Sequence, residues 1–534
     1  MKVLGVIVAC EPVERLRHVV AGQPVLRHVI QRLRRCEGFD DLVVVGPAEV
    51  AALIGDDGVT VVPAPQQPAA CTVRAAAARK WAQDAWRGGP GEACVFDEHF
   101  DAGHLERLVA DRRADAVFLA AGTAVLIDPT LADRMIAHFR EVADEMRMTF
   151  AQAPPGLVGT LLRRDILAEL AAAGICPGQA LAYKPDAPQA DLVAKRCCYQ
   201  VPAGVSSASG RLLADTDRAV RRIEAIVGDL GADPPAERVA EWLAAREFDV
   251  AEGLPREVEI ELAGADQLAG STLRPRSSGR GEMDLALLQR LADELGTADD
   301  VCVVLGGFGE PLLHSRFAEV LAALRRAEVF ALAVRTNGLA LDEAAIGAIL
   351  EHGVEVVTFL LDATTATTYR HVHGHDGLQT ALDRIEALRR ATASAQRAVP
   401  LIACEMVKSL ATYPEMEAFH DGWLRAGAWP VLTGYSDYAG RFDSPDAAVT
   451  NMAPPHRHPC RRLMSRVLVL SDGRVAICDQ DFGGECIMGR LGEGTRLADV
   501  WGGEAFDAAR QAHRDRRWAD AWSGCAACLE WHRP

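Results

Sequence analysis

The chain has 534 residues and a formal net charge of −17. This length exceeds one ordinary domain and predicts two to four, each able to bury a core. The acidic balance argues against a nucleic-acid-binding protein, because phosphate neutralisation requires a basic face. Because of this acidic charge, small or peptidic ligands are the expected partners. Hydrophobic residues make up 49% of the chain, but no apolar run is long enough to span a membrane.

The N-terminal stretch MKVLGVIVAC lacks the flanks of a signal peptide, so we expect a buried strand and a cytoplasmic protein. In a cytosolic chain, 14 cysteines indicate thiols or metal ligands rather than disulfides. Most stand singly in apolar runs, Cys302 and Cys404 among them, and are predicted to be small buried side chains.

Strand-like apolar runs alternate with helical segments, first in KVLGVIVA, DDLVVVG, VTVVPA and ADAVFLAAG, then in DVCVVLGG, VFALAVRT, VEVVTFLL and VPLIACEMV. This alternation predicts α/β domains with parallel sheets. We place an N-terminal domain at residues 1–225, a helical linker at 226–256, a second α/β domain at 257–450 and a small cysteine-rich domain at 451–534.

The segments VIVACEPVERLRHVVAGQPVLRHVIQRL, ADAVFLAAGTAVLIDPTLADRMIAHF and GRLLADTDRAVRRIEAIV resemble the nucleotidyltransferase, or GT-A-like, fold of sugar-nucleotide and cytidylyltransferases. The resemblance implies a glycine-rich phosphate loop and a metal-binding aspartate. Here the loop ACEPVERL has no glycine and carries Glu11, and Thr123 stands at the aspartate position. Phosphoryl transfer depends on charge neutralisation, so a degenerate domain retained for folding, docking or ligand binding is favoured over a transferase acting on a sugar.

The elements VLGGFGEPLLH, VRTNGLAL, VEVVTFLLDATTATTYRHVHG and TGYSDYAGRF occur in order and resemble the radical S-adenosylmethionine (SAM) enzymes. The resemblance implies a partial (β/α)6 barrel over residues 257–450. It also implies six SAM-contacting residues, if binding is retained: Gly307, Gly309, Glu310, Pro311, Thr336 and Asn337.

The reaction of that family needs a CxxxCxxC loop after the first barrel strand, whose three thiolates hold the SAM-cleaving [4Fe-4S] cluster. Here the loop is IELAGADQLAGSTLRPR, and its three ligand positions fall on Asp266, Gly270 and Leu273. Glycine and leucine cannot bind iron, and one carboxylate cannot replace three thiolates. An active enzyme would need ligands from elsewhere, such as Cys302 or Cys404.

The C-terminal region, from PCRRLMSRVLVLSDGRVAICDQD to SGCAACLEW, resembles the SPASM auxiliary-cluster domain. The Asp-Gly turn in LSDGRVAIC predicts a hairpin, and LADVWGGEAFDAARQAH resembles the family's helical insert. The four expected ligands of a [4Fe-4S] cluster are Cys460, Cys478, Cys525 and Cys528. Structural zinc is the alternative, and Cys486 is an extra thiol nearby in sequence.

The order of the three modules resembles proteins called spiro-SPASM. Both older active sites have lost the residues that carry their chemistry, whereas the auxiliary metal site is complete. We therefore expect an accessory protein with one [4Fe-4S] cluster, which binds a substrate or transfers electrons to a partner enzyme. The alternatives are an active radical SAM enzyme that modifies a peptide or small molecule through non-standard cluster ligands, and a nucleotidyltransferase.

Overall fold

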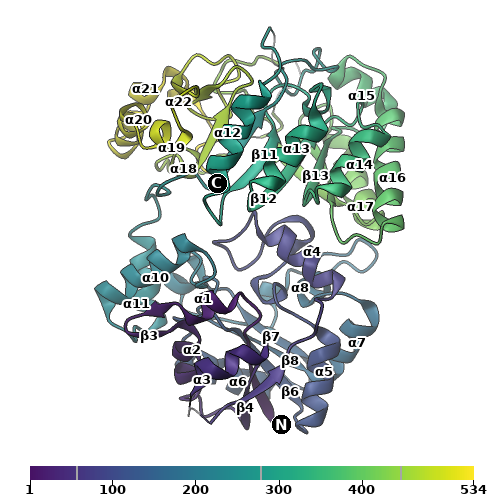
Figure 1. Cartoon of the computed structure of the whole chain (residues 1–534). Coiled ribbons are helices and arrows are strands. Elements are labelled where there is room, and N and C mark those ends of the chain that lie inside the picture. Colours follow the sequence, from purple (N-terminus) through teal and green to yellow (C-terminus); the bar gives the residue numbers. More distant parts are fainter. Residues whose placement is uncertain (56–57, 277–278, 445–447, 451, 534) are drawn as a thin grey trace. The chain divides into compact units, whose positions relative to one another are not determined.

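The computed structural model describes residues 1–55, 58–276, 279–444, 448–450 and 452–533. They form two compact units, Met1–Glu247 and Phe248–Pro534 (Figure 1). The division between the units falls inside the predicted linker 226–256. The predicted boundary at residue 451 lies outside the described residues.

The first unit contains a seven-stranded sheet in the order β5-β4-β1-β6-β8-β7-β9. Strands β1, β4, β5 and β6 are parallel to one another, β8 is antiparallel to β6 and to β7, and β9 is parallel to β7. The strands are β1 (Val3–Val8), β4 (Asp41–Gly46), β5 (Thr60–Pro63), β6 (Ala116–Ala121), β7 (Met148–Ala151), β8 (Thr160–Arg163) and β9 (Cys198–Tyr199). A separate short hairpin pairs β2 (Val19–Val20) with β3 (Gln23–Pro24).

Helices follow the parallel strands of this unit. They are α1 (Val13–Arg17), α2 (Val25–Leu33), α3 (Ala51–Ile54), α4 (Ala70–Arg79), α5 (Ala102–Asp111), α6 (Pro129–Val142), α7 (Arg164–Ala173), α8 (Pro177–Leu181), α9 (Ala203–Ser207), α10 (Asp217–Leu230) and α11 (Ala236–Ala244). Side-chain caps fix several starts: Asp128 accepts from the backbone N–H groups of Thr130 and Leu131 at α6. Helices α10 and α11 pack into the core of this unit, so most of the predicted linker is part of its fold.

The second unit contains a nine-stranded sheet in the order β15-β14-β13-β12-β11-β10-β16-β17-β18. Strands β10 to β15 are parallel and in chain order, as the predicted partial barrel requires. Strand β16 pairs in parallel with β10, and β17 and β18 then follow antiparallel. The strands are β10 (Glu257–Glu261), β11 (Cys302–Gly306), β12 (Ala331–Thr336), β13 (Val356–Leu360), β14 (Leu401–Lys408), β15 (Trp429–Gly434), β16 (Arg466–Val469), β17 (Arg474–Ala476) and β18 (Ile487–Arg490). The cysteine-rich segment therefore extends the barrel sheet.

Helices of the second unit lie beside the strands and, in the C-terminal part, form a cluster of their own (Figure 1). They are α12 (Leu285–Leu295), α13 (Phe317–Arg326), α14 (Glu343–Glu351), α15 (Ala366–His373), α16 (Leu378–Ser394), α17 (Met416–Arg425), α18 (Arg461–Ser465), α19 (Leu497–Trp501), α20 (Glu504–Arg514), α21 (Trp518–Ala521) and α22 (Ser523–Ala527). No helix in the described ranges is long and apolar enough to cross a membrane.

The eight apolar runs read as strands are all strands, and the predicted Asp-Gly hairpin is β16–β17. The sheet faces of β1 and β11 are buried along their whole length, as expected for strands covered on both sides. Pattern alone did not predict the antiparallel strands β7 and β8, or the parallel pairing of β16 with β10.

The loops after β10 and β11 touch each other at the carboxyl end of the sheet. A Cβ atom on Gly309 would lie 1.7 Å from the carbonyl oxygen of Ala263, so only glycine fits at this position. Neighbouring Gly307 adopts a φ of +79°. Both glycines thus have a packing reason to be present, in addition to the cofactor role implied by the sequence.

We expect Gly309→Ala to lower the free energy of unfolding by about 3 kcal/mol, because the added methyl group meets rigid backbone. Denaturant unfolding measures this. The matched control is Gly347→Ala in helix α14, where a Cβ meets nothing within 4 Å. That change should stabilise the protein by about 0.5–1 kcal/mol. Equal effects of the two substitutions would contradict the tight approach of the loops.

Candidate functional site

Buried charges gather at the carboxyl ends of the barrel strands. Arg274, in the loop after β10, donates from Nε and Nη2 to the two oxygens of Asp362 at 2.7 and 2.8 Å. Its Nη1 donates to Oε1 of Glu405 at 2.9 Å. All three side chains are buried. Burial opposes ionisation of Asp362, but Arg274 lowers the pKa of that carboxyl below its ordinary value.

Two further arginines extend this network along the inner face. Arg335 on β12 lies 3.2 Å from Glu405 and 3.5 Å from Glu259 on β10. Arg280 reaches Glu261, at the end of β10, with two hydrogen bonds of 2.7 and 3.0 Å. Each buried charge is therefore paired, which is the condition under which proteins tolerate such groups.

The three positions expected to lack cluster ligands are occupied by ordinary packing. Asp266 is buried, accepts a 2.6 Å hydrogen bond from the backbone N–H of Leu268, and lies 3.2 Å from Arg276. Leu273 is 1% exposed and packs with Val372 and Val407. Gly270 has no side chain, and a Cβ there would approach the backbone of His373 at 3.6 Å.

The residues implied to contact SAM lie together beside this loop. The Glu310 carboxylate accepts hydrogen bonds from Thr336 Oγ1 at 2.7 Å and from the Asn337 backbone N–H at 2.8 Å. The Asn337 side-chain amide donates to Asp266 at 3.2 Å. Burial, aided by Asp266, raises the pKa of Glu310 to about 7 despite these hydrogen bonds. Gly307, Gly309 and Pro311 flank it in the same turn.

Two cysteines were named as substitute cluster ligands. Cys302 is the first residue of β11, at the end of the strand opposite the loop, and Cys404 lies within β14 next to inward-facing Glu405. Side chains alternate along a strand, so Cys404 points to the helix side, where it joins the hydrophobic core. Burial raises the pKa of the Cys404 thiol well above its usual value. Neither thiol is placed to serve the loop after β10.

The four C-terminal cysteines come from three separate elements. Cys460 precedes α18, Cys478 follows β17, and Cys525 and Cys528 lie in and directly after α22. Cys525 is buried and the other three are partly exposed. Around them, Arg457 donates to the carbonyl oxygen of Cys525 at 2.6 Å.

An ion-pair group joins the segments that carry these thiols, because Arg462, two residues after Cys460, pairs with Asp479, next to Cys478, and lies 3.4 Å from Glu530, two residues after Cys528. The pKa of Cys478 is raised first by burial, then by Asp479, and then by the neighbouring sulfurs of Cys460, Cys525 and Cys528. The pKa of Cys525 is likewise raised by burial and by the neighbouring thiols of Cys460, Cys528 and Cys486. Four thiols are the donor set of a [4Fe-4S] cluster and also of structural zinc. Within the described residues, no three His, Cys, Asp or Glu side chains are already arranged to hold one metal ion.

Cys486 was singled out as an extra thiol, and it does lie close to this group. Its sulfur is 3.7 Å from the carbonyl oxygen of Ala521, and it contributes to the raised pKa of Cys525. It stands directly before β18, which starts at Ile487.

In the N-terminal unit, the two residues that depart from the nucleotidyltransferase pattern contact each other. Thr123 Oγ1 donates to Glu11 Oε1 at 3.1 Å, and His99 Nε2 lies 3.3 Å from the same oxygen. Glu11 and Thr123 are both buried. Oxygens of a phosphate would therefore meet a carboxylate at this place, which disfavours a nucleotide triphosphate.

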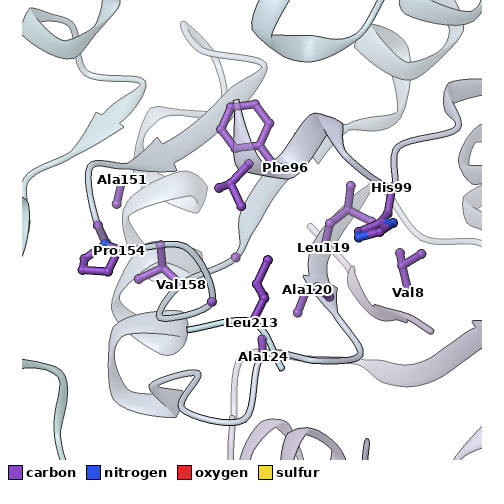
Figure 2. A pocket seen from close by; sticks show the side chains of 15 residues that line it. Val8, Phe96, His99, Leu119, Ala120, Ala124, Ala151, Pro154, Val158 and Leu213 are labelled. Carbon is purple, nitrogen blue, oxygen red and sulfur yellow. The ribbon is translucent and has the colours of Figure 1, made fainter. Parts of the chain in front are cut away.

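A pocket beside these residues is lined almost entirely by apolar side chains (Figure 2). Val8 from β1, Leu119 and Ala120 from β6, and Ala151 from β7 line it together with His99 and Phe96. The lining provides one ionisable group and no lysine or arginine among its residues. An apolar ligand suits such a lining better than a charged one.

Models of known protein families match three parts of the chain. The MobA-like NTP transferase domain matches residues 14–184, the Radical SAM superfamily matches 269–398, and the SPASM iron-sulfur cluster-binding domain matches 460–529. The chain joins an NTP-transferase-like, a radical SAM and a SPASM domain. The fold class and the resemblances stated from the sequence are thereby confirmed.

Two curated relatives align with parts of the chain. An uncharacterized protein of Treponema pallidum (strain Nichols) is 22% identical over 291 residues, which are 50% of this chain and 77% of that protein. A protein of Pyrococcus furiosus described as "Tungsten-containing aldehyde ferredoxin oxidoreductase cofactor-modifying protein" is 26% identical over 153 residues, which are 28% of this chain and 43% of that protein.

Solved structures are also similar to stretches of this chain. SuiB of Streptococcus suis, solved bound to its precursor peptide SuiA, is 13% identical, with a TM-score of 0.40, covering 55% of this chain and 74% of SuiB. A cytidylyltransferase of Leptospira borgpetersenii is 11% identical, with a TM-score of 0.31, covering 46% of this chain and 94% of that structure.

No sequence motif gives a role to Arg274, Asp362 and Glu405, whose ion pairs lie at the carboxyl ends of the radical SAM strands. One signal was available: Glu405 is a single charge inside the apolar run LIACEMV, and a charge buried in a strand needs a partner. The identity of that partner, 131 residues earlier in the chain, follows only from the fold.

A buried ion-pair cluster also stabilises the NTP-transferase-like domain. Glu98 lies 3.0 Å from Arg79 and 2.7 Å from Arg211, and all three side chains are buried. Burial alone would raise the pKa of Glu98, but Arg211 and Arg79 together lower it to about 2.

We expect Glu98→Gln to destabilise this domain by about 3 kcal/mol at pH 7. Because the folded-state pKa lies below the unfolded value, this stabilisation is present above about pH 5 and is lost as the pH falls towards 2. The difference between wild type and variant should therefore shrink between pH 5 and pH 3 in denaturant unfolding. Glu145→Gln, which removes an exposed pair with Arg196, is the control and should have little effect. A difference that stays constant with pH would contradict this assignment.

Proposed function

We propose that this iron-sulfur radical SAM-family protein is an accessory protein that holds one auxiliary [4Fe-4S] cluster and has no SAM-cleaving cluster of its own. The observation that carries the proposal is the loop after β10. Its three cluster positions are Asp266, Gly270 and Leu273, and the first and last of these side chains are buried in contacts of their own.

The surroundings of the loop support the same conclusion. A cluster there would need thiolates, yet the buried groups at the mouth are arginines and carboxylates paired with one another, led by Arg274 with Asp362 and Glu405. Displacing Arg274 would leave two buried carboxylates without a counter-charge, at a cost of several kcal/mol. In this proposal the paired side chains occupy the place that a cluster would need.

We assign the auxiliary site to Cys460, Cys478, Cys525 and Cys528, because they belong to the matched SPASM segment and the ion pairs of Arg462 join the segments that carry three of them. When bound, such a cluster supplies a one-electron redox centre. Four protein ligands leave no iron open for SAM, so the chain's own contribution is to hold the cluster and tune it through neighbouring charges. Arg462, paired with Asp479 and with Glu530, is one such charge, and it opposes the rise that burial causes in the pKa of Cys460 and Cys528.

An accessory role then follows from what the two larger domains can still offer. The radical SAM domain keeps the Gly-Glu-Pro and Thr-Asn elements, and the N-terminal domain keeps an apolar pocket. We propose that the protein binds a small molecule or peptide, or docks on a partner enzyme, and exchanges electrons through its single cluster. An active enzyme with Cys302 or Cys404 as ligands is disfavoured by the positions of those thiols, away from the loop.

Metal analysis tests the auxiliary cluster. After anaerobic preparation, we expect about four irons and about four acid-labile sulfides per chain, because four thiolates hold one cubane. Cys478→Ala should lose most of this iron together with the absorbance near 400 nm. The matched control is Cys302→Ala, a buried thiol outside the group, which should keep both. One zinc per chain without iron would exclude the cluster.

Incubation of the anaerobic protein with SAM and dithionite tests the missing cluster. We expect no 5′-deoxyadenosine above the level of a no-protein control, because the electron donor for SAM cleavage has no ligands in the loop after β10. Product that depends on Cys302 or Cys404 would favour an active enzyme instead. Binding of SAM without cleavage, measured by equilibrium dialysis in the same samples, would agree with retention of the Glu310, Thr336 and Asn337 contacts.

A further inference from the structure

Arg276 is a buried cation with most of its hydrogen-bonding capacity unused. Its side chain is 6% exposed, and its Nη1 lies 3.2 Å from Asp266 Oδ2. Its Nε and Nη2 are buried and have no hydrogen-bond partner among the described residues. These two atoms form one edge of the guanidinium, the edge that holds a carboxylate through two parallel hydrogen bonds.

Tyr369 on α15 brings a third unused donor to the same place. Its side chain is fully buried, and its hydroxyl has no hydrogen-bond partner in the part of the chain described. Its ring lies against His373, with ring centroids 4.6 Å apart. The loop that carries Arg276 packs on this helix, because the backbone N–H of Thr272 donates to the carbonyl oxygen of Val372 at 2.8 Å and Ser271 Oγ lies 3.3 Å from His373 Nδ1. The charges of Arg276 and Asp266 both act on the Tyr369 phenol.

At neutral pH the Tyr369 hydroxyl is a hydrogen-bond donor, whereas His373 is not a cation that would bind an anion. Burial and the neighbouring Asp362 raise the pKa of the Tyr369 phenol, so at neutral pH it is a hydrogen-bond donor. A guanidinium offers five N–H donors and no acceptor. His373 does not compete for an anion, because burial lowers its pKa to about 4 and its two ring nitrogens already face Ser271 and the carbonyl oxygen of Leu361.

Unpaired buried donors are costly, and native proteins rarely leave three in one place without a ligand or water. The donors come from two elements that pack on each other, the loop after β10 and helix α15. The carboxyl groups of Asp266 and Glu310 stand beside them, and Asp266 Oδ2, which lies 3.2 Å from Arg276 Nη1, is buried and has no hydrogen bond among the described residues. A phosphate with two charges would be repelled there, whereas one carboxylate with an ammonium next to it would be matched on both sides.

We propose that Arg276 and Tyr369 form a binding subsite for the carboxylate of an α-amino acid group, with Asp266 facing its ammonium. The subsite occupies the place of the missing cluster and so rests on the part of the proposed function that leaves this loop without iron. The group could belong to SAM itself or to a free amino acid, and the experiment separates these two sources.

The test measures binding by isothermal titration calorimetry on the full chain, with SAM, L-methionine, L-methioninamide and inorganic phosphate as probes. We expect at least one of SAM and L-methionine to bind, while methioninamide, which lacks the carboxylate, and phosphate bind at least tenfold more weakly. Binding of SAM without methionine would identify the cofactor as the source, and binding of both would identify the amino-acid group itself.

Two variants assign the binding to the subsite. Tyr369→Phe should weaken it at least tenfold without lowering the melting temperature, because the hydroxyl that it removes makes no hydrogen bond in the described structure. Arg276→Gln should weaken it further. The matched control is Tyr413→Phe, an exposed tyrosine, which should bind as the wild type does.

Equal binding of methionine and methioninamide, binding that is insensitive to Tyr369→Phe, or no binding of either carboxylate probe would each overturn the subsite. A protein whose iron content confirms the single auxiliary cluster but which fails this test would retain the proposed function and lose only the subsite. Iron bound in addition at the loop after β10 would remove the proposed function and the subsite together.

Discussion

The buried guanidinium of Arg274 joins three parts of the radical SAM domain that are far apart in sequence. It is bidentate to Asp362 after β13 and bonded to Glu405 on β14, and it lies in the loop that follows β10. A buried charge is stable only beside its counter-charges, so replacing any one of these three residues would leave another buried charge without its partner. Arg335 connects Glu405 to Glu259 and extends the same constraint across the inner face of the sheet.

This constraint explains how the domain can keep its fold while its first loop has no cysteine. In a cluster-binding protein the metal itself would cross-link the loop to the barrel and contribute to folding. Here ion pairs and the burial of Leu273 hold the loop instead. The Gly-Glu-Pro turn stays in place for a related reason, since Glu310 anchors Thr336 and Asn337 while Gly309 packs against Ala263.

The SPASM cysteines depend on the same strand. Strand β16 pairs with β10, Arg466 lies 2.9 Å from Glu257, and Ser471 donates to Glu261 at 3.1 Å. Helix α19 is fixed from the other side, because the backbone N–H groups of Leu497 and Ala498 donate to Glu294 on α12. The radical SAM and SPASM domains are therefore one compact unit around one sheet, whatever the chemistry that remains at each site.

The sequence by itself determined the three domains, the strands that build both sheets and the identity of the residues missing from each older active site. Periodicity and motif order are local signals, so they can be recognised in the sequence without the structure. The four cysteines could also be identified from the sequence, although only the fold brings together the segments that carry them. Only the tertiary structure decided which contacts form at these positions: Thr123 with Glu11, Arg274 with Asp362 and Glu405, and the donors of Arg276 and Tyr369 that meet no hydrogen-bond partner among the described residues. Such pairs join residues that lie about a hundred positions apart, and no local pattern states which buried charge meets which.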